Sequence, residues 1–179
     1  LCLPTIEKLD RKLAQFCQSR GIEYRASLIT NGRFLSEKAV EVLLKSNIVK
    51  LQVSFDGTEE TYCAFKKASA EDYKITLENV AVAAEKGLPV VIRINIREND
   101  FSSAYELANL LLRKMNLSGK LRLYPAFVNE GCKEERQEKY KQFVEEEKKF
   151  AEYIKTTFSS GDYFNKLAVA HGIPCSLIC

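Results

Sequence analysis

Small polar residues follow two of the predicted strands at the point where each strand ends. Ser54 and Asp56 lie at the end of the apolar stretch Ile48–Phe55. Thr30 and Asn31 occupy the same place at the end of the preceding strand. Ligands of α/β proteins usually bind at the carboxyl ends of strands, where short donors and acceptors are held rigidly. Ordinary strand-to-turn sequence is the alternative interpretation of either pair taken alone.

The six cysteines do not form a recognisable disulfide or metal pattern. Only Cys175 and Cys179 are close, as C-x-x-x-C, and the four others share no common spacing. An α/β chain of this size does not need disulfide staples. We therefore interpret the cysteines as thiols in a reducing compartment.

Composition favours a single cytoplasmic domain. The chain has 179 residues with 46% apolar content, enough for one compact core. Its net charge of +3 argues weakly against a nucleic-acid partner. No apolar run approaches the roughly 20 residues of a membrane span, and no signal peptide is recognisable, so we expect no membrane association.

Strands and helices are expected to alternate along the chain. Period-two and β-branched stretches predict four strands, at Ile22–Ile29, Ile48–Phe55, Pro89–Ile96 and Leu121–Val128. Helical periodicity and capping patterns predict five helices, at Pro4–Arg20, Glu37–Lys45, Ser69–Lys86, Ala104–Met115 and Lys133–Phe158. The segment Thr58–Ala68 is expected to be a loop.

This order predicts an α/β fold in which four parallel strands are adjacent and sequential, with helices on the outer face only. Four strands are too few to close a barrel, and the chain opens with a helix. We therefore expect part of a TIM-like (β/α) barrel whose amino-terminal units are missing.

Five motifs in order carry a resemblance to a family: LITNGRFL, QVSFDGTEETY, VVIRINIREND, LRLYPAFV and GIPCSLIC. The series resembles radical S-adenosylmethionine (SAM) enzymes of the SPASM type, such as anaerobic sulfatase and peptide maturases. The resemblance implies a partial (β/α)6 barrel over residues 1–158. Residues 159–179 would be a linker and the start of the SPASM auxiliary-cluster region.

The resemblance also implies a function. Such enzymes are oxidoreductases that use a [4Fe–4S] cluster to cleave SAM to a 5′-deoxyadenosyl radical and so modify a peptide or protein. Their partners are that substrate and a flavodoxin- or ferredoxin-type reductant. The family's C-x3-C-x2-C loop and G-G-E-P segment are absent from this sequence. We therefore expect the chain alone to be inactive, to hold no cofactor and to contribute no catalytic residue.

Several residues match the family's SAM-binding positions. Thr30 and Asn31 belong to the T-N-G turn under the cofactor, and Ser54 matches the serine that bonds the ribose or methionine end of SAM. Asp56 is expected to shape the turn after it. For the SAM carboxylate, the position of the usual arginine holds Lys66.

Arg93 is the other candidate for the SAM carboxylate, although a structural ion pair would explain it equally well. Cys175 and Cys179 match the first ligands of an auxiliary iron–sulfur cluster. The alternative function is a non-catalytic α/β scaffold or binding module that has lost its cluster. An upstream C-x3-C-x2-C in the full reading frame would separate the two. A nucleotide-binding domain is disfavoured because neither of its glycine-rich motifs occurs.

Overall fold

The fold is α/β, with one sheet of four parallel strands in the order β1-β2-β3-β4. The computed structural model describes residues 2–97, 100–114, 121–128 and 133–157. The strands are β1 (Ala26–Thr30), β2 (Ile48–Phe55), β3 (Val90–Ile96) and β4 (Leu121–Phe127). The predicted class, strand direction and strand order are therefore confirmed.

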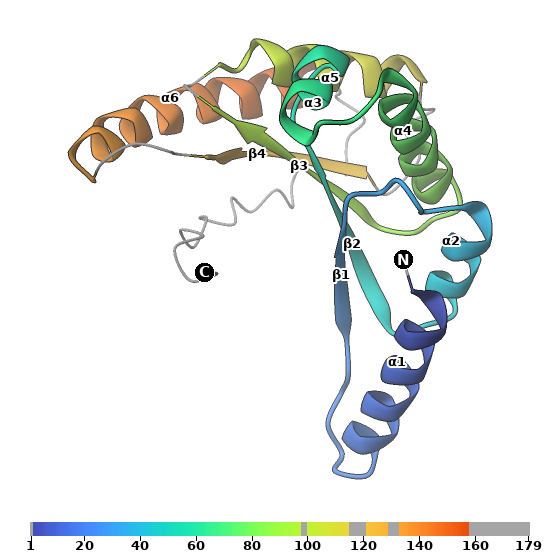
Figure 1. Cartoon of the computed structure of the whole chain (residues 1–179). Coiled ribbons are helices and arrows are strands. Elements are labelled where there is room, and N and C mark those ends of the chain that lie inside the picture. Colours follow the sequence, from blue (N-terminus) through green and yellow to red (C-terminus); the bar gives the residue numbers. More distant parts are fainter. Residues whose placement is uncertain (1, 98–99, 115–120, 129–132, 158–179) are drawn as a thin grey trace.

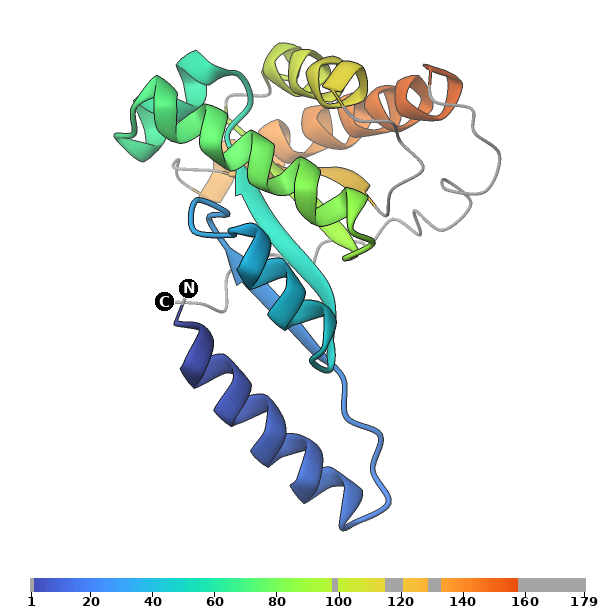
Figure 2. The same cartoon turned by 90° about the vertical axis from the view of Figure 1, so that its right-hand side faces the viewer.

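Six helices in the described ranges connect and flank these strands. They are α1 (Leu3–Gln18), α2 (Glu37–Leu44), α3 (Glu59–Lys66), α4 (Ala70–Glu85), α5 (Ser102–Lys114) and α6 (Lys133–Thr157). Figure 1 shows α2, α3, α4, α5 and α6 on the same side of the twisted sheet, and the turned view in Figure 2 agrees. Helices were expected on one face only, and the described residues follow that arrangement.

Side-chain burial alternates along each central strand and separates two faces of the sheet. In β3, Ile92 and Ile94 are 0% exposed, whereas Val91, Arg93 and Asn95 are only half-buried. Side chains in a strand alternate between the two faces. The isoleucines therefore face the helices, and we call that side the covered face. The opposite side is the open face.

The residues of the open face follow from this alternation and from the strand pairing. They are Ser27, Ile29, Lys50, Gln52, Ser54, Val91, Arg93, Asn95, Arg122, Tyr124 and Ala126. The core on the other side is built from strand residues and from helix residues such as Val40, Leu43, Leu77, Val80, Leu107 and Phe150. One face of the sheet thus supplies the core, and the other carries mostly polar side chains, with Ile29, Val91 and Ala126 among them.

The first strand begins later than its sequence suggested. Strand character was expected from Ile22, but β1 starts at Ala26 and Ile22 is 53% exposed. Ala26 pairs with Ile48, the first residue of β2. In the described part of the chain, residues before Ala26 therefore pair with no strand.

The segment expected to be a loop, Thr58–Ala68, contains the helix α3. Thr58 has the extended backbone of an N-cap, and Glu59 and Glu60 lie in the first turn, where carboxylates favour a helix. Tyr62 is 3% exposed and attaches this short helix to the core. The prediction of a loop was wrong because tertiary packing stabilises a helix too short to be recognised by its period.

Local capping explains where the next helix begins. The predicted capping box of α4 is present: the Ser69 hydroxyl accepts from the Asp72 amide at 3.1 Å, and the Asp72 carboxylate accepts from the Ser69 amide at 3.0 Å. Together these bonds satisfy two amides that a helix start leaves without intrahelical partners. The remaining helix boundaries agree with the predictions within two residues.

The long charged segment predicted to be a surface helix forms α6. Its apolar residues pack on α5 and the loop before it, with ring centroids 5.3 Å apart for Phe101 and Phe143 and 5.1 Å apart for Tyr105 and Phe150. Within the described ranges, every helix is too short or too polar to cross a bilayer. The expected linker and auxiliary-cluster region at 159–179 lies outside the described residues.

We predict that the two faces of the sheet contribute unequally to stability. Ile92→Ala removes a side chain that is 0% exposed and should lower the free energy of unfolding by about 2–5 kcal/mol. Ile29→Ala makes the same change at an open-face position that is 68% exposed and should cost less than about 1 kcal/mol. Urea unfolding followed by circular dichroism measures both. Equal losses would contradict the assignment of the faces.

Candidate functional site

The buried carboxylate of Asp56 lies at the carboxyl end of β2. Asp56 is 5% exposed, and its Oδ1 accepts a hydrogen bond from the Asn95 side-chain amide of β3 at 3.0 Å. Its Oδ2 is 3.5 Å from the Lys66 ammonium of α3. A buried carboxylate is stable only when it is paired and hydrogen-bonded. Asp56 therefore joins three elements at one edge of the sheet.

The turn that follows Asp56 is tightly packed. Gly57 has φ +96°, a conformation that favours glycine, and a Cβ built on it would lie 2.5 Å from the Cβ of Ser103. Ser103 lies in the first turn of α5 and is 8% exposed. Glycine at position 57 is thus required both by the backbone conformation and by the close approach of α5.

Lys66 is bound within the protein. Its ammonium donates to the Ser54 carbonyl at 2.9 Å in addition to its ion pair with Asp56, and its side chain is 22% exposed. An ammonium has three N–H donors, and the Ser54 carbonyl and the Asp56 carboxylate both lie near that of Lys66. Lys66 therefore acts first as a tie between α3 and the end of β2.

An aromatic cluster holds α3 in place for this contact. The rings of Phe55, Tyr62 and Tyr73 lie 5.3 to 5.8 Å apart and connect β2, α3 and α4. Burial raises the pKa of Tyr73 to about 12, so its hydroxyl stays neutral at physiological pH. The cluster places Lys66, on the last turn of α3, over the Ser54–Asp56 segment.

Arg93 lies in the middle of the open face. Its register neighbours are Ser54 on β2 and Tyr124 on β4, both of which carry hydroxyl groups. Among the described residues, no hydrogen bond or ion pair of its guanidinium is found. Arginine keeps its charge at any physiological pH. A half-buried guanidinium beside two hydroxyls is a suitable receptor for an anion.

Two residues that the sequence did not single out belong to the same surface. Asn95 binds Asp56, and the Tyr124 hydroxyl donates to the Gln52 side chain at 3.2 Å. Both lie at positions that alternate with the apolar residues of their strands. That alternation, counted from Arg93 and Ser54 across the paired strands, is the signal that could have identified them.

Thr30 and Asn31 shape a turn at the end of β1. The Thr30 hydroxyl accepts from the Gly32 amide at 3.2 Å, and the Asn31 carbonyl oxygen accepts from the Arg33 amide at 3.3 Å. Thr30 pairs with Val53, so it lies on the covered face, opposite to Ser54. The hydroxyls of Thr30 and Ser54 therefore do not converge on one surface, although their strands are neighbours.

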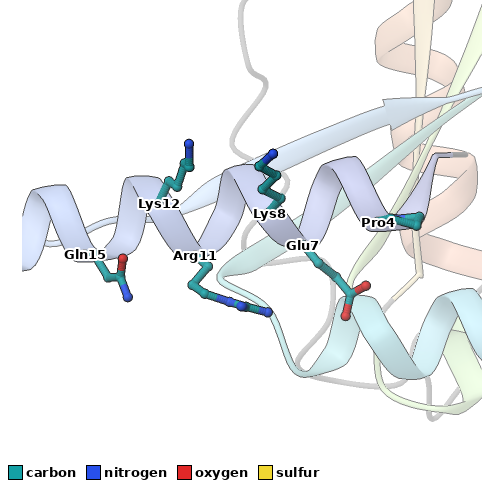
Figure 3. Close-up of a pocket in the computed structure, with 6 residues that line it drawn as sticks. All are labelled: Pro4, Glu7, Lys8, Arg11, Lys12 and Gln15. Atoms are coloured by element: carbon teal, nitrogen blue, oxygen red, sulfur yellow. The ribbon is translucent and has the colours of Figure 1, made fainter.

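A separate shallow hollow lies along α1, far in sequence from the strand ends. Figure 3 shows its six lining residues projecting from this single helix: Pro4, Glu7, Lys8, Arg11, Lys12 and Gln15. None of the residues of α1 is fully buried. A ligand in this hollow would contact residues of α1 alone, and we exclude the hollow from the candidate site.

The described residues contain no group of three or more His, Cys, Asp or Glu side chains placed to hold a metal ion. Cys175 and Cys179, the predicted ligands of an auxiliary cluster, lie outside the described residues. The structure therefore leaves the predicted cluster ligands untested.

No protein-family model matches the chain, and neither a curated protein nor a solved structure matches it. The candidate site is accordingly defined by its geometry. It consists of Ser54, Asp56, Lys66, Arg93 and Asn95, from β2, the turn after it, α3 and β3. We call this group the strand-end site.

We predict that Lys66 stabilises the folded protein through its contacts in the strand-end site, and not simply through its positive charge. Lys66→Met leaves the Asp56 carboxylate buried without its cation and should lower the free energy of unfolding by about 1–3 kcal/mol. Lys67→Met makes the same change at the adjacent exposed residue and should have an effect near zero. Chemical denaturation of both variants measures the difference. A Lys66 variant as stable as the Lys67 variant would show that the tie contributes nothing.

Proposed function

We propose that this chain is the carboxyl-terminal part of a partial (β/α)6 barrel in a radical SAM oxidoreductase of the SPASM type. In this proposal the strand-end site binds SAM. The observation that carries it is the position of Ser54 and Arg93 beside each other, at the carboxyl half of consecutive parallel strands. The motif series of the sequence supports the same assignment.

The strand arrangement is compatible with a barrel. Barrel strands run parallel in sequential order, with helices outside and the inner face turned toward a central site. The four strands of this chain follow that order, and the open face corresponds to the barrel interior. Among the described residues, β1 has no neighbour on its outer side, which is where upstream strands would pair.

The residues of the strand-end site fit SAM in part. The Ser54 side chain lies on the open face and can bond a ribose hydroxyl or the methionine end. Lys66 is already bound to Asp56 and to the Ser54 carbonyl. Arg93 therefore becomes the favoured partner of the SAM carboxylate, because guanidinium and carboxylate can form two parallel hydrogen bonds.

The remaining predicted residues take supporting roles in this proposal. Asp56 orients the end of β2 through Asn95 and Lys66. Thr30 and Asn31 form the turn after β1 through their bonds to backbone amides. These residues keep the strand ends rigid, so that the Ser54 side chain is already in position when the ligand binds.

The chemistry would come from the cofactor and the cluster. A [4Fe–4S] cluster reduced by a flavodoxin- or ferredoxin-type protein would supply the one-electron cleavage of SAM on which radical chemistry at a peptide or protein depends, and Ser54 and Arg93 would hold the SAM molecule. The chain's own contribution is to bind and orient SAM and to offer the open face to the substrate.

We predict that Ser54→Ala weakens SAM binding several-fold, since one lost hydrogen bond costs on the order of 1 kcal/mol. Ser27→Ala makes the same change near the opposite end of the open face and should leave the affinity unchanged. Calorimetry on an anaerobically reconstituted longer protein that carries a C-x3-C-x2-C loop measures both.

Two outcomes would contradict the proposed function. The Ser54 variant could bind SAM as tightly as the unsubstituted protein, in which case the strand ends are ordinary turns. The reconstituted longer protein could also fail to produce 5′-deoxyadenosine from SAM and dithionite. Either result would favour a non-catalytic α/β module.

A further inference from the structure

A hydrogen bond between two side chains crosses the middle of the open face. The Tyr124 hydroxyl of β4 donates to the Gln52 side-chain oxygen of β2 at 3.2 Å, and β3 lies between these two strands. Both side chains are half-buried. We call this contact the Gln52–Tyr124 bridge. Neither of its residues belongs to the strand-end site.

Strand pairing places the bridge directly beside Arg93. Tyr124 pairs with Arg93 on β3, and Arg93 pairs in turn with Ser54 on β2. Gln52 lies two residues before Ser54 and pairs with Val91. The bridge therefore runs diagonally over β3, from the row of Arg93 to the row of Val91, which is nearer the amino ends of the strands.

The bridge requires both of its side chains to lean across the sheet. Two strand spacings, about 10 Å, separate β2 from β4, and the two residues are offset by about 7 Å along the strands. Side chains that stood perpendicular to the sheet would not meet over such a span. The tyrosine and glutamine side chains together therefore form a barrier on the amino side of Arg93.

The surroundings of Arg93 leave one direction for its guanidinium. Ser54 and Tyr124 flank Arg93 on the neighbouring strands, and the bridge lies toward the amino ends. The strand-end site lies toward the carboxyl ends, and no described residue forms a hydrogen bond or ion pair with the guanidinium there. The long arginine side chain is thus directed toward the end of the sheet where a ligand would bind.

We propose that the Gln52–Tyr124 bridge positions Arg93, by keeping the guanidinium on the carboxyl side of the open face where a ligand carboxylate can pair with it. Gln52 and Tyr124 are positioning residues, because they act through Arg93. Ordering a long side chain before the ligand arrives removes part of the entropy cost of binding. The proposal rests on the proposed function only in naming SAM as the ligand.

The alternative role of the bridge is to stabilise the sheet by linking β2 to β4. That role would change the free energy of unfolding and leave the Arg93 side chain equally mobile with or without the bridge. The mobility of Arg93 itself therefore separates the two roles.

The first test measures this mobility in the 179-residue chain without SAM. NMR relaxation of the arginine side-chain N–H groups gives their order parameters, and Arg93→Lys identifies the signal of Arg93. Tyr124→Phe should lower the order parameter of the Arg93 Nε–H group from about 0.8 to below about 0.6. Gln52→Leu breaks the same bond and should have the same effect. Unchanged order parameters in both variants would overturn the proposal.

Tyr153→Phe is the matched control for the loss of a tyrosine hydroxyl. The Tyr153 hydroxyl of α6 donates to the Asn109 side-chain oxygen of α5 at 2.7 Å, so this variant removes the same kind of bond away from the open face. It should leave the order parameter of Arg93 unchanged. A loss of order as large as that in Tyr124→Phe would overturn the proposal, since any loosening of the fold would then release Arg93.

The second test uses calorimetry on the anaerobically reconstituted longer protein that carries a C-x3-C-x2-C loop, with SAM and decarboxylated SAM as ligands. Tyr124→Phe should weaken binding of SAM about fivefold and that of decarboxylated SAM less than about twofold, because only SAM presents a carboxylate to Arg93. Equal weakening of the two ligands would overturn the proposal.

The same titrations show whether the bridge acts through Arg93. In a protein that already carries Arg93→Gln, Tyr124→Phe should change the SAM affinity less than about twofold, and a further fivefold loss would overturn the proposal. Failure of the unsubstituted longer protein to bind SAM would contradict the proposed function. The order parameter of Arg93 in the 179-residue chain would still decide the role of the bridge.

Discussion

The carboxyl edge of this sheet depends on a single buried carboxylate. Asp56 is 5% exposed, and Asn95 and Lys66 supply the hydrogen bond and the ion pair that a buried carboxylate needs. Asn95 comes from β3 and Lys66 from α3. Both the strand order and the packing of this short helix are therefore needed to place the two partners beside the Asp56 carboxylate. The same bonds bring the Ser54 backbone under Lys66 and leave the Ser54 hydroxyl for a ligand.

The one-sided packing of helices determines where charge is balanced. On the helix side, Lys86, the C-cap residue of α4, lies 2.6 Å from the carboxylate of Glu37 at the start of α2, so opposite charges meet there. On the open face, the strands carry cations, neutral polar groups and a few apolar side chains, and no acidic residue. Arg93 on that face can pair with the carboxylate of SAM, which is the physical basis of the proposed function.

The sequence predicted what depends on local periodicity and missed what depends on contacts between distant residues. The strand Ile48–Phe55 and the alternation around Arg93 are local, and both are observed. The start of β1 depends on where β2 begins, and α3 depends on Tyr62 reaching the core. Asn95 was missed because its partner lies 39 residues away in the chain.

Hydroxyl-radical footprinting tests most directly whether the sheet keeps one face free for ligands. Neighbouring residues on the same strands give the comparison: Val91 and Tyr124 lie on the open face, and Ile92 and Leu123 on the covered face. Relative to intrinsic reactivity, oxidation at Val91 and Tyr124 should be faster than at Ile92 and Leu123, as resolved by mass spectrometry. Equal protection of both pairs would show that another segment covers the open face, and would contradict this account.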